Sequence, residues 1–255
     1  IFLTVGILFS ILVYVLIKGI PNLTPELFAW KYTTENVSMM PAIINTVIMI
    51  VLTLMLAVPI GLFAAIYLVE YSKRGNRFVK IIRVTAETLS GIPSIVYGLF
   101  GYIVFVITLG WSFTLLSGVI TMAIMILPLI MRTTEEALMA VPDSFREGSF
   151  GLGAGRLRTV FRIVLPSSIP GILSGVILAI GRIVGESAAL IFTSGTNPVV
   201  PKSLFSSAST LSVHLYTLLN EGRYTDQAYA TAVVLLIVVI IINALSSVVA
   251  KKLSR

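Results

Sequence analysis

The chain contains no cysteine and only one histidine. The missing cysteines exclude a disulfide framework, a thiolate nucleophile and a cysteine-ligated metal, and one histidine is too few for a histidine-built metal site. Charged residues are also scarce, at 11% of the 255 residues, whereas a soluble domain carries about 25%. We therefore expect no metal site in this chain.

Hydrophobic residues, by contrast, account for 57% of the chain. With so few charges, too little polar surface remains to cover a water-soluble globule of this size. The composition excludes a soluble enzyme and a disordered protein, and it predicts an integral membrane protein. The net charge of +7 is also typical of a nucleic-acid binder. The positions of the basic residues along the chain, described below, explain this charge by membrane orientation instead.

Long runs without charged residues locate the membrane spans, because a helix needs about 20 mostly apolar residues to cross the hydrocarbon core. The run at residues 36–69 has room for one span, and the run at residues 88–131 has room for two. Residues 1–17 resemble the apolar part of a signal peptide, but no small-residue cleavage site follows them, so we interpret them as a span. We predict one transmembrane domain over residues 1–255 with six spans, at 1–17, 42–68, 90–109, 113–131, 168–192 and 228–249. Because the sequence does not begin with methionine, we also expect residues upstream of it.

Basic residues mark the cytoplasmic side, since short cytoplasmic loops carry an excess of lysine and arginine. Of the 18 basic residues, 13 fall between the second and third spans, between the fourth and fifth, or after the sixth, against four in the other connections. The distribution predicts that both termini are cytoplasmic, and it explains most of the positive charge without nucleic acid. The basic and apolar residues at 73–84 also suit a helix that lies on anionic lipid, and the pattern leaves these two interpretations open.

The predicted cytoplasmic loop at residues 132–166 contains a short helix. Ser144 and Glu147 have the spacing of a capping box directly after Pro142, which predicts the start of the helix. Three glycines at 151–155 predict its end after about two turns. A helix this short needs a partner surface. The glycine spacing is not that of a dinucleotide-binding fingerprint, and no P-loop motif occurs, so we do not expect the chain to bind ATP.

Arg182 and Glu186 stand inside the predicted fifth span. At positions i and i+4 of one helix they could reach each other. Because an intramembrane charge costs at least about 2.5 kcal/mol, it usually faces the bundle interior or a water-filled path. Arginine offers a fork of donors to a tetrahedral oxyanion, Glu186 could accept a hydrogen bond from protonated phosphate, and Ser187 adds polar lining. A neutralising pair that only fixes helix packing is the alternative, and the residues alone favour neither.

The loop resembles the EAA signature of ABC importer permeases, which reads E-A-A, three residues, G, nine residues, I-x-L-P. The positions that match this spacing are Glu147, Gly148, Ser149, Gly153, Ile163, Leu165 and Pro166. In that family the short helix sits in a groove of a cytoplasmic ATPase, so the resemblance implies that these residues couple the chain to an ATPase. The departure is Gly148, where alanine is usual, and it weakens a helix by about 1 kcal/mol.

Other segments resemble the PstA-type subunit of the phosphate-specific (Pst) permeases, at residues 87–101, 132–138, 170–175, 181–188 and 211–216. The resemblance implies an all-α type I ABC importer permease (MetI-like) of the prokaryotic plasma (inner) membrane, with six transmembrane helices and a coupling helix between spans four and five. Arg182 and Glu186 match the intramembrane pair that the family associates with phosphate passage, and with Ser187 they form the expected substrate pathway. Ala189 stands where proline is frequent in relatives.

The same resemblance implies that the chain has no catalytic residues and moves inorganic phosphate inward by alternating access. It implies a second, PstC-like permease subunit, a dimeric PstB-like ATPase that binds ATP and magnesium, and an extracytoplasmic PstS-like phosphate-binding protein. No cofactor is expected in this chain. The alternatives are an ABC permease for another oxyanion, such as phosphonate, sulfate or molybdate, and an ion-coupled secondary transporter. The latter predicts mid-membrane ion ligands and inverted repeats, which we do not find in the sequence.

Overall fold

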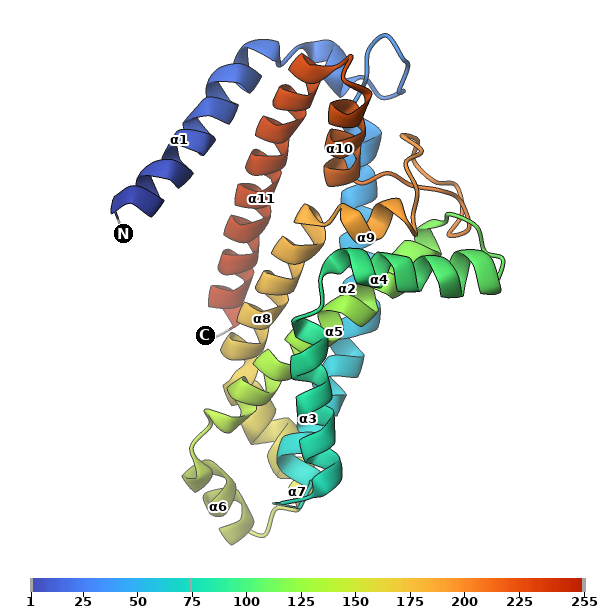
Figure 1. The fold of residues 1–255 in the computed structure, drawn as a ribbon. Helices are drawn as coiled ribbons and strands as arrows, with labels where there is room; N and C mark the ends of the chain where they lie inside the picture. The colour runs from blue at the N-terminus through green and yellow to red at the C-terminus, as the bar shows by residue number, and fades with distance from the viewer. Residues whose placement is uncertain (1, 74, 254–255) are drawn as a thin grey trace. The chain divides into compact units, whose positions relative to one another are not determined.

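The computed structural model describes residues 2–73 and 75–253. In this part of the chain the regular structure is entirely helical (Figure 1). A helix satisfies its backbone polar groups internally, which hydrocarbon requires of a spanning segment. The predicted all-α membrane fold is confirmed. Arg74 and Arg255, two of the basic residues used for the orientation, lie outside the described residues.

The longer helices are α1 (Phe2–Gly19), α2 (Met40–Ile66), α3 (Arg77–Ser90), α5 (Leu115–Met139), α8 (Leu165–Gly185) and α11 (Thr225–Leu253). The shorter α-helices are α4 (Ser94–Gly101), α6 (Asp143–Gly151), α7 (Arg156–Thr159), α9 (Ala188–Ile191) and α10 (Leu211–Glu221). Two 3-10 helices, η1 (Ile20–Asn22) and η2 (Pro25–Phe28), follow α1. Three π-helical segments extend or precede longer helices: η3 (Tyr67–Tyr71), η4 (Tyr102–Thr108) and η5 (Val160–Val164).

Five helical segments among the described residues are long and apolar enough to cross a membrane, and the count becomes six if α3 and α4–η4 form one broken span. The five are Leu3–Asn22, Met40–Tyr71, Leu115–Met139, Arg156–Gly185 and Thr225–Leu245. The predicted span at 90–109 corresponds to α4 and η4. It begins at Ser94 because Pro93 disfavours a helical conformation at the residue before it.

Two compact units share the long helices. Unit 1 comprises Ile1–Val51, Ser94–Thr121 and Ile183–Ile242, and unit 2 comprises Leu52–Pro93, Met122–Arg182 and Asn243–Arg255.

Unit 2 has a core in which the end of α2, η3, α3, α5 and η5 meet. Its buried members are Ala65, Ile66, Leu68, Val79, Met131, Leu138, Val141, Val160 and Val164. Helix α8 packs closely on α5, because a β-carbon on Gly171 would lie only 2.6 Å from the Cβ of Ala137. Helix α3 is held to α5 by an ion pair of 2.5 Å between Arg83 and the buried Glu135.

In unit 1, helix α4 packs directly on α9. A β-carbon on Gly98 would lie 2.8 Å from the Cα of Ala189 and 3.2 Å from the carbonyl oxygen of Ala188. Real side chains do not approach backbone this closely, so a glycine is required for the two helices to touch. This contact fixes the position of α9, which directly follows Glu186 and Ser187.

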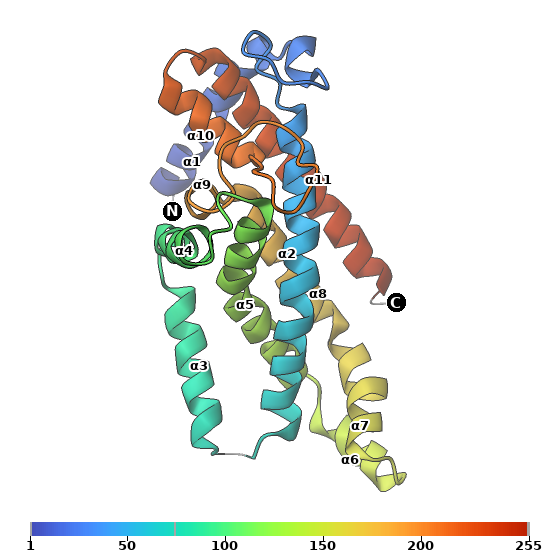
Figure 2. The same cartoon turned by 90° about the vertical axis from the view of Figure 1, so that its right-hand side faces the viewer.

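The loop between α9 and α10 is fastened to the first half of α2, which it crosses in Figure 2. Asn45 Nδ2 donates to the backbone oxygens of Val199 and Ser209, at 3.1 and 3.0 Å. Thr46 Oγ1 accepts a hydrogen bond of 2.9 Å from the backbone N–H of Leu211, the first residue of α10. These two polar residues of α2 therefore hold a loop in place.

His214 lies buried in α10. Its ring meets that of Tyr32 edge-on, at 6.1 Å between centroids, and its Nε2 has no hydrogen-bond partner among the described residues. Burial lowers the pKa of His214 to about 4, against a smaller opposite effect of a hydrogen bond to the backbone of Val37. The imidazole is therefore neutral in the folded protein at ordinary pH.

We expect this histidine to make the fold sensitive to acid. Between pH 6.5 and about 4 the unfolded chain binds a proton that the folded chain refuses, so stability falls as the pH falls through this window and levels off below it. The contribution is on the order of 3 kcal/mol. The contribution is measured by comparing the unfolding midpoints of the wild type and His214→Gln. Tryptophan fluorescence in detergent follows the unfolding from pH 7.5 to 4. The wild type should lose more stability than the variant on acidification, and parallel curves would contradict the assignment.

Candidate functional site

Helix α6 forms the short loop helix that the glycine spacing predicts. It ends at Gly151, and Gly153 has φ of +79°, in the left-handed region that favours glycine. The capping box is wrong, because α6 begins at Asp143 and its N-cap position is Pro142, which makes no side-chain cap. Ser144 therefore lies inside the first turn rather than at the cap.

One face of α6 turns inward and is polar. Ser149, the only buried residue of this helix, has its hydroxyl 2.8 Å from that of Thr159 on α7. Arg146, one turn earlier, has a side chain that is 14% exposed. Ser149, which the resemblance assigns to ATPase coupling, thus contacts its own chain and fastens α6 to α7. The two helices lie next to each other in Figure 1.

The opposite face of α6 is exposed and consists of small residues around one acid. Glu147, Gly148 and Gly151 are exposed, and a β-carbon on Gly148 would meet nothing within 4 Å. Phe145 and Phe150 on the flanks are also exposed. Sequence reasoning missed these two aromatic side chains, although apolar residues on a short polar helix were a visible signal.

Leu152 follows the helix and is 92% exposed, so it adds apolar area beside Phe150. The polar inward face and the partly apolar outward face reverse the usual arrangement of a surface helix. A partly apolar, exposed face of this kind is suited to contact with another protein.

The other loop positions lie in the helix that follows. Ile163 lies in η5. Leu165 and Pro166 are the first two residues of α8, and Leu165 is half-buried against the unit 2 core. Pro166 lacks the N–H that would continue an α-helical ladder, and the wider π-helical turn of η5 precedes it. These residues therefore shape the connection from the loop into α8, whereas Glu147 and Gly148 lie on the exposed face of α6.

The predicted fifth span, which contains Arg182 and Glu186, is not one continuous helix. Helix α8 ends at Gly185, and Glu186 and Ser187 connect it to α9. The Glu186 carboxylate accepts a hydrogen bond of 3.0 Å from the backbone N–H of Ala189, and its carbonyl accepts one of 2.6 Å from Ser212 Oγ on α10. Glu186 is 8% exposed, and these bonds hold it at the start of α9.

Arg182 lies in the last turn of α8 on an open face. Leu178, Gly181, Arg182 and Gly185 share this face by their i, i+3, i+4 and i+7 spacing. Leu178 is 60% exposed, and a β-carbon on Gly181 or Gly185 would meet nothing within 4 Å. In the part of unit 2 that the structure describes, the half-buried Arg182 has no hydrogen bond or ion pair. Its guanidinium donors are therefore available.

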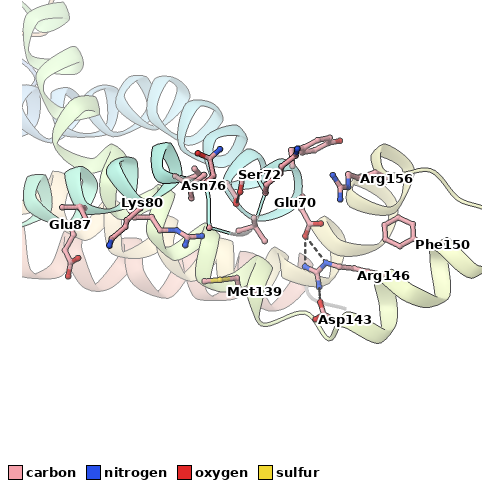
Figure 3. Close-up of a pocket in the computed structure, with 18 residues that line it drawn as sticks. Glu70, Ser72, Asn76, Lys80, Glu87, Met139, Asp143, Arg146, Phe150 and Arg156 are labelled. Atoms are coloured by element: carbon pink, nitrogen blue, oxygen red, sulfur yellow. Dashed lines mark hydrogen bonds and ion pairs between the residues drawn. The ribbon is translucent and has the colours of Figure 1, made fainter.

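A cavity of about 1150 Å³ opens in unit 2 between η3, α3 and α6 (Figure 3). The charged side chains that line it are Glu70, Lys73, Lys80, Arg83, Glu87, Asp143, Arg146 and Arg156. In Figure 3 Arg146 lies between Glu70 and Asp143 and is bonded to both. The guanidinium of Arg156 stands over the ring of Tyr71, 5.8 Å from its centroid. The distribution of basic residues predicts only that Arg146 is cytoplasmic, and no sequence pattern points to Glu70.

Comparison with known proteins decides the family. A family described as "Binding-protein-dependent transport system inner membrane component" matches residues 57–255. The chain belongs to this family. It is thus a multi-pass inner-membrane component of an ABC transport system, and the subunit that hydrolyses ATP is a separate chain.

Individual permeases of the family extend the match. The probable ABC transporter permease protein YqgI of Bacillus subtilis is 32% identical, over 98% of this chain and 92% of its own. The phosphate transport system permease protein PstA 1 of Mycobacterium tuberculosis (strain H37Rv) is 34% identical, over 82% of this chain and 68% of its own. The predicted PstA-type ABC permease is confirmed.

A solved structure supports the predicted MetI-like fold. The MetNI methionine ABC transporter, solved in inward-facing conformations, aligns with a TM-score of 0.65 at 17% identity. The alignment covers 96% of this chain and 98% of the other.

Two glycines of the permease loop should respond in opposite ways to alanine. Gly153→Ala places a side chain in the left-handed region, at a cost of about 1–2 kcal/mol, and should weaken the shape of the loop. Gly148→Ala has free space and a helical backbone, so it should strengthen α6 by about 1 kcal/mol. ATP-driven uptake by the reconstituted complex should fall in the first variant and persist or rise in the second. Equal losses in both would show that the conformation at Gly153 is not what matters.

Proposed function

We propose that this chain is the permease subunit of an ATP-driven importer that moves inorganic phosphate into the cytoplasm. The observation that carries the proposal is the similarity to permeases named for phosphate transport, at 30–34% identity over 79–92% of the chain. The name of YqgI states no substrate. The chain provides the membrane path and performs no bond chemistry.

The family also implies the kinds of partner. A binding-protein-dependent importer needs an ATPase, a solute-binding protein and a second permease. For a phosphate system these are a PstB-like ATPase dimer, an extracytoplasmic PstS-like protein and a PstC-like permease. ATP and magnesium would be bound by the ATPase. In this arrangement both termini of the chain and helix α6 are cytoplasmic, in agreement with the excess of basic residues.

Helix α6 is the proposed coupling helix. Its inward face is held by Arg146 and Ser149, so its exposed face, with Glu147 and Gly148, is free to enter a groove of the ATPase. The small residues on this face permit close approach, and the flanking aromatic side chains offer apolar contact area. Closure of the ATPases then moves α6 and, with it, the spans.

Arg182 is the proposed contact of the phosphate on its path. The guanidinium presents planar paired donors that suit a tetrahedral oxyanion, and the glycines beside it leave its helix face open. Glu186 and Ser187 follow at the end of the helix. A carboxylate there would accept a hydrogen bond from protonated phosphate and repel sulfate, which carries no proton at neutral pH. This difference favours phosphate over sulfate.

Reconstitution of the chain with its co-encoded partners in liposomes tests the proposal. We expect ATP-dependent uptake of labelled phosphate that excess unlabelled phosphate suppresses and that sulfate, molybdate and phosphonate leave unchanged. ATP-driven uptake of a different oxyanion would overturn the substrate and keep the transporter class. Uptake driven by an ion gradient without ATP would overturn both.

A further inference from the structure

Arg146 joins α6 to two membrane helices through a single guanidinium group. Its Nε and Nη2 donate to the same carboxylate oxygen of Glu70, at 3.1 and 2.7 Å. Its Nη2 also donates to the carbonyl of Leu138 at 2.9 Å, and its Nη1 donates to that of Val141 at 2.8 Å. A further bond of 3.2 Å from Nη1 reaches Asp143 within α6 itself. Every nitrogen of the group is thus engaged.

The bonded groups lie where the long helices end. Glu70 belongs to η3, the π-helical extension of α2. Leu138 lies in the last turn of α5, and Val141 directly follows that helix. The last carbonyls of a helix have no partners within it, and a cation there also meets the negative end of the helix dipole. Arg146 therefore closes the end of α5 while it holds the end of α2.

The other packing contacts of α6 are mainly with α7 and η5, which lead into α8. No residue of α6 belongs to the buried core of unit 2 as the structure describes it. The Ser149 hydroxyl bonds to α7, which belongs to the same loop. Because the Glu70 carboxylate is only 8% exposed and the Arg146 side chain 14%, solvent weakens their attraction much less than it weakens a surface pair. The ion pair is thus the strongest contact between α6 and α2.

We propose that the Arg146–Glu70 ion pair is the link that carries a movement of α6 into α2 and α5. This inference rests on the proposed function, since it describes how ATPase closure reaches the spans. Both are positioning residues, and neither touches substrate. A rigid link makes α6 and the two helix ends move together. Without it, α6 stays attached to α7 and η5 but no longer moves the ends of α2 and α5, and ATP is hydrolysed without transport.

Glu70→Gln tests the link with the smallest change, because the amide keeps the shape of the side chain and removes its charge. The readout is solute transported per ATP hydrolysed by the full reconstituted complex. A purely structural role would reduce assembly, whereas a link predicts normal assembly and a coupling ratio that falls by about tenfold. An unchanged ratio in an assembled complex would overturn the proposal.

Glu136→Gln is the matched control. Glu136 forms an equivalent pair of 3.0 Å with Arg132, but both residues lie on α5, one turn apart, and are about 60% exposed. This pair joins no two elements, so its loss should leave the coupling ratio unchanged. A loss as large as that in Glu70→Gln would show a general charge effect and overturn the link.

A covalent bridge provides the rescue. The chain has no cysteine, so Glu70→Cys with Arg146→Cys introduces its only two thiols, which a short bifunctional thiol reagent can join. The double variant should be uncoupled before cross-linking and should regain most of the ratio afterwards, with either single variant unaffected by the reagent. No recovery in cross-linked complexes would contradict the link. The ratio is measured with whichever solute the wild type carries, so failure of phosphate uptake would overturn only the proposed substrate.

Discussion

The fold depends on the requirement that polar groups in hydrocarbon find partners within the protein. Four threonine hydroxyls donate to the carbonyl oxygen four residues earlier, those of Thr46, Thr121, Thr133 and Thr231. Among the described residues, the buried hydroxyls of Thr53 and Thr134 are exceptions without a partner. The buried carboxylate of Glu135 pairs with Arg83, and that of Glu186 accepts a backbone N–H. Against this pattern Arg182 has no partner in the described part of its unit. An unpaired cation on an open helix face is costly, and an anionic substrate would offset the cost.

The helical class and the membrane location follow from composition, because few polar residues and long apolar runs admit little else. The end of α6 could also be predicted, since Gly153 takes a conformation that other residues avoid. The cap lies two residues before the predicted one, because Pro142, rather than Ser144, occupies the cap position. Local chemistry locates such boundaries to within one or two residues.

What could not be predicted depends on contacts between distant residues. Glu70 and Arg146 are 76 positions apart. The excess of basic residues in cytoplasmic loops already explains an arginine at position 146, so nothing in the sequence suggests that it has a buried partner. At the end of α8, the Glu186 carbonyl accepts a hydrogen bond from Ser212 on α10, another contact between residues distant in the sequence. The apolar run at 168–192 contains no proline near residue 186, and Gly185 alone does not outweigh the length of the run, so the sequence predicts one unbroken span.

In the proposed mechanism Arg182 receives the anion, and the Arg146–Glu70 ion pair transmits the movement that releases it. Arg182→Gln tests this most directly, beside Arg132→Gln as a control for loss of one arginine. We predict that the Arg182 variant assembles and hydrolyses ATP in response to the loaded binding protein, but that phosphate uptake falls at least about tenfold. Uptake at the wild-type rate in an assembled Arg182→Gln complex would contradict the account.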